Sequence, residues 1–91
     1  MASLQGKVAI VTGAGSVGPG WGNGKATSVL LAREGAAVFL IDLVAEAAAE
    51  TESIIRGEGG ESASHQCDML VAAEVERAVQ ACVARFGRVD I

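Results

Sequence analysis

The stretch that decides the fold lies near the N-terminus, where residues 7–24 read KVAIVTGAGSVGPGWGNG. Residues 7–11 form a short, mostly apolar run that ends in a turn signal at Thr12 and Gly13. Such runs are typical of strands buried on both faces of a parallel sheet. Residues 13–24 contain six glycines and the only proline of the chain. We therefore expect no regular element to run through this glycine-rich loop.

Helices and strands alternate beyond the loop. The helix-forming residues 25–34 precede a stop at Gly35, and the apolar residues 37–41 predict a second buried strand. Residues 44–55 predict an amphipathic helix. Its apolar face comprises Val44, Ala47, Ala48, Thr51, Ile54 and Ile55. Residues 62–67 form a weaker third strand, which is predicted mainly from its position.

The last helix has the clearest periodicity. Its apolar stripe comprises Val71, Val75, Ala78, Val79, Cys82, Val83 and Phe86. Gly87 closes this helix, and residues 88–91 begin what we interpret as a fourth strand. The alternation predicts an α/β fold with a three-layer, Rossmann-like parallel sheet, in which the third, second and first strands lie in that order.

Composition and charge exclude several classes of protein. Of the 91 residues, 51% are hydrophobic, which is typical of a globular core. The net charge of −4, without a basic stripe, argues against a nucleic acid or an anionic membrane as partner. No apolar run approaches the ~18–20 residues of a membrane span, and residues 1–7 lack the apolar core of a signal peptide, so we expect a cytoplasmic protein.

Two residue types carry simpler expectations. Cys67 and Cys82 show no metal-ligand spacing, so we expect no metal site and interpret both as reduced, buried thiols. Charged residues such as Lys25 and Glu50 are expected on solvated helix faces.

A glycine-rich turn between a strand and a helix is typical of a phosphate site, because backbone N–H groups and the helix dipole both favour an anion there. Two registers compete. Residues 13–18 fit GxGxxG, but the helix-breaking residues 19–24 would then open the helix. We prefer the register that ends at residues 22–24. Asp42 lies 18 residues beyond Gly24, near the spacing of a ribose-binding carboxylate.

Taken together, these motifs resemble the short-chain dehydrogenase/reductase family. The family pattern has TGxxxGxG, an acidic residue after the second strand, an aspartate and a hydrophobic residue after the third, and FGxxDxLVNNAG into the fourth. The matching stretches are residues 6–16, 22–27 and 32–36, then Asp42, Cys67-Asp68-Met69 and residues 86–91. The resemblance covers essentially the whole chain, and it implies an NAD-dependent oxidoreductase that interconverts an alcohol and a carbonyl.

The resemblance implies a role for each matching residue. Gly13 would form the tight turn at the pyrophosphate, and Ser16 would lie beside the adenosine ribose. Gly22, Asn23 and Gly24 would offer backbone N–H groups and close approach at the start of the helix. No arginine or lysine stands at position 43 or just before Gly22, where the family often places a partner for a 2′-phosphate, so NAD is favoured over NADP.

The resemblance implies a second set of residues that would bind the adenosine half of the cofactor. Asp42, with Leu43 following, would bind the adenosine ribose, Asp68 would accept a hydrogen bond from the adenine amino group, and Met69 would line the adenine slot. The alternative interpretation of both aspartates is that they cap the helices that follow them.

Two departures from the family pattern keep alternatives open. Residues 17–21 interrupt TGxxxGxG, and a related insertion occurs in the divergent branch of enoyl reductases, which reduce a carbon–carbon double bond. The chain also contains no tyrosine, and the family's catalytic residues lie beyond the fourth strand.

We therefore expect residues 1–91 to be the N-terminal part of a single NAD-binding domain, without catalytic residues and inactive alone. A non-catalytic nucleotide-binding fragment is the further alternative. The whole enzyme would act on a small alcohol or ketone and would form homo-oligomers, as its relatives do.

Overall fold

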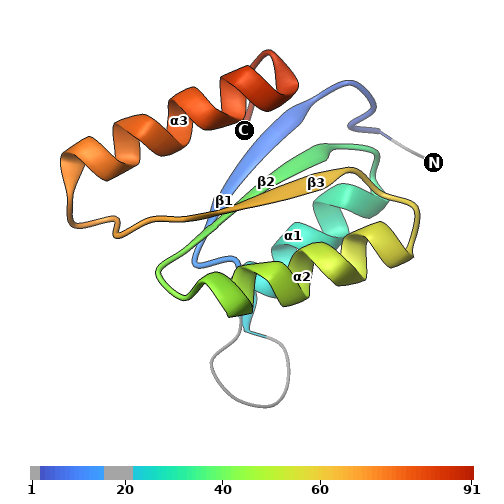
Figure 1. The fold of residues 1–91 in the computed structure, drawn as a ribbon. Coiled ribbons are helices and arrows are strands. Elements are labelled where there is room, and N and C mark those ends of the chain that lie inside the picture. Colours follow the sequence, from blue (N-terminus) through green and yellow to red (C-terminus); the bar gives the residue numbers. More distant parts are fainter. Residues whose placement is uncertain (1–2, 16–21) are drawn as a thin grey trace.

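The computed structural model describes residues 3–15 and 22–91. A three-stranded parallel sheet lies between two layers of helices (Figure 1). The elements in chain order are β1 (Val8–Thr12), α1 (Asn23–Arg33), β2 (Ala37–Asp42), α2 (Ala45–Gly57), β3 (Ser62–Gln66) and α3 (Ala72–Phe86). The strand order is β1-β2-β3 with both pairs parallel, which confirms the predicted α/β sheet and its order.

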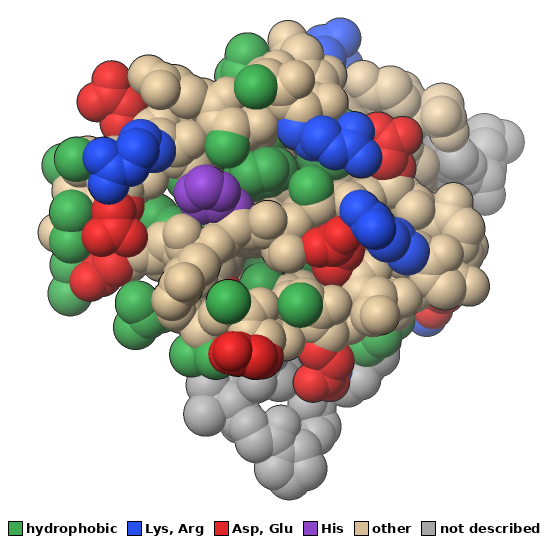
Figure 2. Space-filling view, viewed as in Figure 1, with side chains coloured by type: hydrophobic (Ala, Val, Ile, Leu, Met, Phe, Trp, Pro, Cys, Tyr) green, Lys and Arg blue, Asp and Glu red, His purple; other side chains and the backbone are tan. Residues whose placement is uncertain are grey.

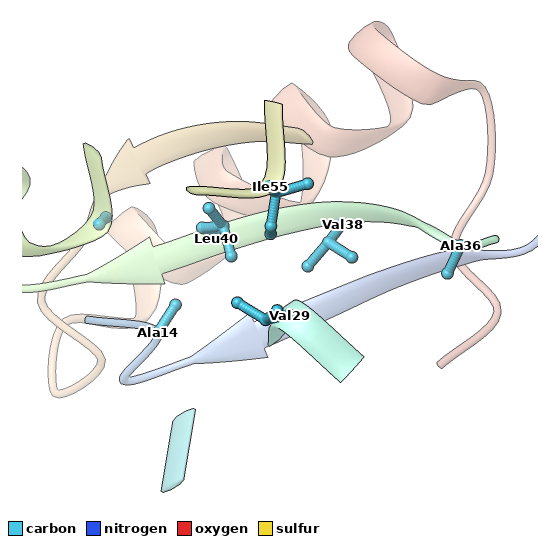
Figure 3. Close-up of a cluster of buried hydrophobic side chains, with 7 residues drawn as sticks. Ala14, Val29, Ala36, Val38, Leu40 and Ile55 are labelled. Carbon is cyan, nitrogen blue, oxygen red and sulfur yellow. The ribbon is translucent and has the colours of Figure 1, made fainter. Parts of the chain in front are cut away.

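Helices α1 and α2 cover one face of the sheet, and α3 covers the other (Figure 1). Alternate residues of β2 serve the two layers, because successive side chains of a strand point to opposite faces. Val38 and Leu40 point toward α1 and α2, where they pack with Val29 and Ile55 (Figure 3). All four side chains are essentially without solvent exposure. This first core fixes α1 and α2 against the sheet.

The second core lies under α3. Phe39 and Ile41 of β2 pack there with Ala78 and Cys82 of α3, and with Cys67 beyond β3. The two cysteines are free and buried, as predicted. Burial raises the pKa of both thiols, so each remains a small, protonated apolar group of the core.

The helices differ from the predictions in two places. Helix α1 begins at Asn23, two residues before the predicted start at residue 25. The first turn of a helix makes few intrahelical N–H bonds, so poor helix formers are tolerated there. In α3, Val79 and Val83 are 41% and 44% exposed and lie outside the core. Each follows a fully buried residue, Ala78 or Cys82, and so lies about 100° further around the helix.

The predicted fourth strand is not assigned as a strand, but its backbone pairs with β1. Asp90 and Ile91 donate their N–H groups to the Val8 carbonyl, and Ile10 donates its N–H to the Ile91 carbonyl at 3.0 Å. The Asp90 carboxylate also accepts a hydrogen bond from the Val8 N–H at 2.8 Å. Hydrogen bonds from Arg88 and from this N–H lower the pKa of Asp90. The segment therefore lies along the free edge of β1.

Gly24 offers a test of how tightly α1 meets the end of β1. A Cβ on Gly24 would overlap the Gly13 carbonyl oxygen, whereas a Cβ on Gly57, in the last turn of α2, would meet nothing within 4 Å. We expect Gly24→Ala to destabilise the protein, in the full length in which it is naturally made, by about 1–3 kcal/mol, because the overlap must be relieved by backbone movement. Gly57→Ala, the matched control, should be neutral or stabilising by up to ~1 kcal/mol. Thermal unfolding measures both, and equal stability of the two variants would contradict the close approach.

Candidate functional site

The candidate site lies where the carboxyl ends of the three parallel strands meet. Thr12 of β1 is the register partner of Ile41, and Asp42 of β2 is the register partner of Gln66. The Cys67 N–H donates to the Asp42 carbonyl at 3.0 Å, so pairing continues just beyond β3. The residues that follow each strand therefore gather at one edge of the sheet, which is where open α/β sheets bind their ligands.

The chain turns sharply after β1, at residues 13–15, and we call this segment the glycine bend. Gly13 has φ +61°, a left-handed conformation that glycine adopts without steric cost. Ala14 has no exposed surface, and its N–H donates to the Ile41 carbonyl at 3.1 Å. The Gly15 N–H donates to Oδ2 of Asp42 at 3.0 Å. The bend is therefore attached to the end of β2 by two hydrogen bonds.

Helix α1 starts against the glycine bend, because Gly24 closely approaches the Gly13 carbonyl. Gly22 is its N-cap, and the first intrahelical bond runs from the Ala26 N–H to the Gly22 carbonyl at 3.1 Å. The N–H groups of Asn23 and Gly24 precede that bond, and no acidic residue occupies the first turn. Such a helix start carries partial positive charge and favours an anion.

The Asp42 carboxylate is oriented by two backbone N–H groups. Oδ2 accepts from Gly15, and Oδ1 accepts from Val44 at 2.8 Å. The structure thus brings Asp42 next to the glycine bend, as its spacing in the sequence predicts. Asp42 does not cap α2 directly, because the N-cap of α2 is Val44. A carboxylate held in this way retains lone pairs that can accept hydrogen bonds from hydroxyl groups.

The remaining predicted residues form the rim of this edge. Leu43 and Met69 are 61% and 46% exposed, and the Gln66 side chain donates to the Leu43 carbonyl at 3.0 Å. Asp68 is half-buried, and its Oδ1 accepts from the Leu70 N–H at 2.9 Å, a turn that leads into α3. Figure 2 shows hydrophobic side chains gathered over the connection between β3 and α3. This rim offers apolar surface beside two carboxylates.

Some predicted features lie elsewhere or were misjudged. Ser16 and the inserted residues 17–21 lie outside the described residues. Lys25 was expected on a solvated face, but it is only 4% exposed, and its ammonium lies 2.7 Å from a carboxylate oxygen of Glu50. The ion pair joins α1 to α2. Within residues 3–15 and 22–91, no group of three metal-binding side chains comes together.

The contribution of α2 to the site is not apparent from the sequence. The sequence pattern puts Thr51 in the apolar face of this helix, and Thr51 is indeed fully buried. Its hydroxyl, however, donates to the Ala14 carbonyl at 2.9 Å. A threonine among alanines in the middle of a helix is an unfavourable choice for helix formation, and that was the available signal.

Comparison with known proteins gives the family. The family model of the short chain dehydrogenases matches residues 7–91. This chain belongs to the short-chain dehydrogenase family. One relative is D-threitol dehydrogenase of Mycolicibacterium smegmatis, which is 41% identical to this chain over 88 residues. The alignment covers 97% of this chain and 32% of that enzyme. The 7alpha-hydroxysteroid dehydrogenase of Escherichia coli is 34% identical over 88 residues, and the alignment covers 97% of this chain and 32% of that enzyme.

Solved structures agree in fold. A short-chain dehydrogenase/reductase of Burkholderia xenovorans superposes with a TM-score of 0.93 at 49% identity, over 99% of this chain and 36% of the other. A metagenomic short-chain oxidoreductase in complex with NADP superposes with a TM-score of 0.87 at 35% identity, over 98% of this chain and 38% of the other. The chain thus spans about a third of the length of the relatives that it matches. In the described part of the chain, no helix is long and apolar enough to cross a membrane.

The two buried thiols give a test of the packing beneath this edge. Cys67 lies directly before Asp68, and its sulfur is 4.0 Å from the Met69 sulfur. Because burial raises the pKa of both thiols, we expect them to react with a thiol reagent at pH 8 at least about tenfold more slowly in the native protein than in urea. Their contribution to stability is complete below the ordinary thiol pKa of about 8.5 and is lost as the pH rises toward the raised pKa of the folded state.

Single Cys67→Ala and Cys82→Ala variants assign the labelling to each site. Rapid labelling of both thiols in the native protein would contradict the burial of this core.

Proposed function

We propose that this chain binds NAD at the carboxyl edge of its sheet, and that the enzyme that carries it interconverts an alcohol and a carbonyl. The observation that carries the proposal is the placement of Asp42, whose Oδ2 lies 3.0 Å from the Gly15 nitrogen of the glycine bend. A carboxylate and a helix start beside one bend match the two halves of a dinucleotide, its ribose hydroxyls and its pyrophosphate.

The residues present fit this cofactor. The N–H groups of Asn23 and Gly24 at the start of α1 would hold the pyrophosphate, and Gly24 gives the backbone the close approach to Gly13 that a side chain would block. Asp42 would accept hydrogen bonds from the adenosine ribose, and Leu43 and Met69 would flank the adenine. Asp68 would accept from the adenine amino group. Ser16 and Gly22 complete the proposed set.

NAD is preferred over NADP because of charge. The Asp42 carboxylate would repel a 2′-phosphate, and the next residue is the exposed Leu43 rather than a basic side chain. A solved relative with the same fold is in complex with NADP, so the fold itself does not decide between the two cofactors. The acidic end of β2 is therefore the feature on which the choice depends.

The proposal assigns binding and orientation to residues 1–91, as the N-terminal part of a single NAD-binding domain. Bound NAD would supply the hydride acceptor, while this chain fixes its adenosine half. The family's acid–base tyrosine has no counterpart within residues 1–91, so no residue of this chain receives a catalytic role and the chain alone would be inactive. We propose a small alcohol or ketone as substrate and the cytoplasm as location.

Titration with NADH and NADPH, followed by nicotinamide fluorescence, tests the proposal on the natural polypeptide. We expect NADH to bind at least about tenfold more tightly than NADPH, because a carboxylate–hydroxyl hydrogen bond is replaced by repulsion of a phosphate. Asp42→Asn keeps an acceptor for one backbone N–H but removes the charge. It should weaken NADH binding about tenfold and reduce the difference between the NADH and NADPH affinities.

Glu76→Gln is the matched control, since it removes one exposed charge from α3 and should leave both affinities unchanged. Tighter binding of NADPH than of NADH by the unaltered protein would refute the preference. Absence of binding by either dinucleotide would refute the proposed function.

A further inference from the structure

A buried hydroxyl on α2 contacts the glycine bend. Oγ1 of Thr51 donates a hydrogen bond to the Ala14 carbonyl oxygen at 2.9 Å. The same oxygen lies 3.4 Å from the carbonyl of Ala47, the bond that a threonine within a helix ordinarily makes to its own preceding turn. The shorter distance belongs to the bond across the structure. The hydroxyl is therefore directed at β1's end rather than back along α2.

Burial makes this contact difficult to replace. Thr51 and Ala14 both have no exposed surface, so water cannot reach the Ala14 carbonyl if the hydroxyl is removed. A buried carbonyl without a donor is costly, and the backbone around it would shift to find one. The bend has little other freedom, because its Ala14 and Gly15 N–H groups are already engaged by Ile41 and Asp42.

Helix α2 also limits the bend sterically. A Cβ on Gly15 would overlap Ala47, which shows that the Gly15 backbone rests directly on that alanine. Ala47 and Thr51 are one helical turn apart, so they present a single face to the bend. One residue supplies close contact and the other supplies a hydrogen bond. Both contact the bend from α2 and are not among the residues proposed to bind the dinucleotide.

We propose that Thr51 is a positioning residue for the dinucleotide site, and that Ala47 is its steric counterpart. The inference rests on the proposed function, since it concerns the same site. Through the Ala14 carbonyl, Thr51 sets the height of the glycine bend above α2. That height fixes the Gly15 N–H on Asp42 and the Gly13 carbonyl against the start of α1. The protein groups proposed to bind the ribose and the pyrophosphate are thereby held at a fixed distance from each other. Small displacements of such groups weaken binding.

Three variants of the natural polypeptide test this inference, with the NADH dissociation constant and the thermal midpoint measured for each. Thr51→Val keeps the shape and removes the hydroxyl, so we expect NADH binding to weaken about tenfold. Thr51→Ser retains the hydroxyl, and its NADH dissociation constant should lie within about threefold of that of the unaltered protein. Ile55→Val, one turn further along α2 and equally buried, should lower the thermal midpoint but leave the dissociation constant unchanged.

The control separates a positioning role from a merely structural one, because Ile55→Val perturbs the same helix without touching the bend. If Thr51→Val fails to fold, Ala47→Val replaces it. Its added methyl groups press on Gly15 without altering the hydroxyl, and we expect weaker NADH binding there too. Unchanged NADH affinity in a folded Thr51→Val, or in Ala47→Val where that variant replaces it, would overturn the inference while leaving the proposed function intact. If the unaltered protein binds neither NADH nor NADPH, both are overturned together.

Discussion

The Asp42 carboxylate accepts hydrogen bonds from Gly15 at 3.0 Å and from Val44 at 2.8 Å, and so it joins the end of β1 to the start of α2. Much of the carboxyl edge depends on this arrangement. Without an acceptor at the end of β2, the Gly15 N–H would have to find another partner and the bend could rotate. The same carboxylate is the group proposed to select the cofactor, so local folding and recognition depend on one side chain.

Two helices contact the glycine bend through very small residues. Gly24 of α1 meets Gly13, and Ala47 of α2 meets Gly15, in both cases so closely that a larger group would overlap. The Lys25–Glu50 ion pair links the same two helices. Because Lys25 is buried while Glu50 is exposed, the pair is only partly shielded from solvent and adds little net stability. Close backbone packing therefore acts together with the hydrogen bonds of Asp42 and Thr51 to set the geometry of the site.

Much of the fold could be predicted from the sequence, because apolar runs and glycine stops report directly on local structure. The first two strands followed from such patterns, whereas the third was predicted mainly from its position. The strand order followed from the alternation of the elements, and the nearness of Asp42 to the bend followed from its spacing. Thr51 and Lys25 could not be predicted in the same way, since their partners lie 37 and 25 residues away and are known only once the helices pack. Likewise, the periodicity of α3 marks an apolar stripe, but only the packed sheet shows that Val79 and Val83 are exposed.

A crystal structure of the natural polypeptide grown with NADH tests the central claim most directly. The account predicts the adenosine ribose hydroxyls within hydrogen-bond distance of the Asp42 carboxylate, with the pyrophosphate at the N–H groups of Asn23 and Gly24. The bend itself should stay on Thr51 and Ala47. Density for the dinucleotide at another edge of the sheet, or a ribose turned away from Asp42, would contradict the account.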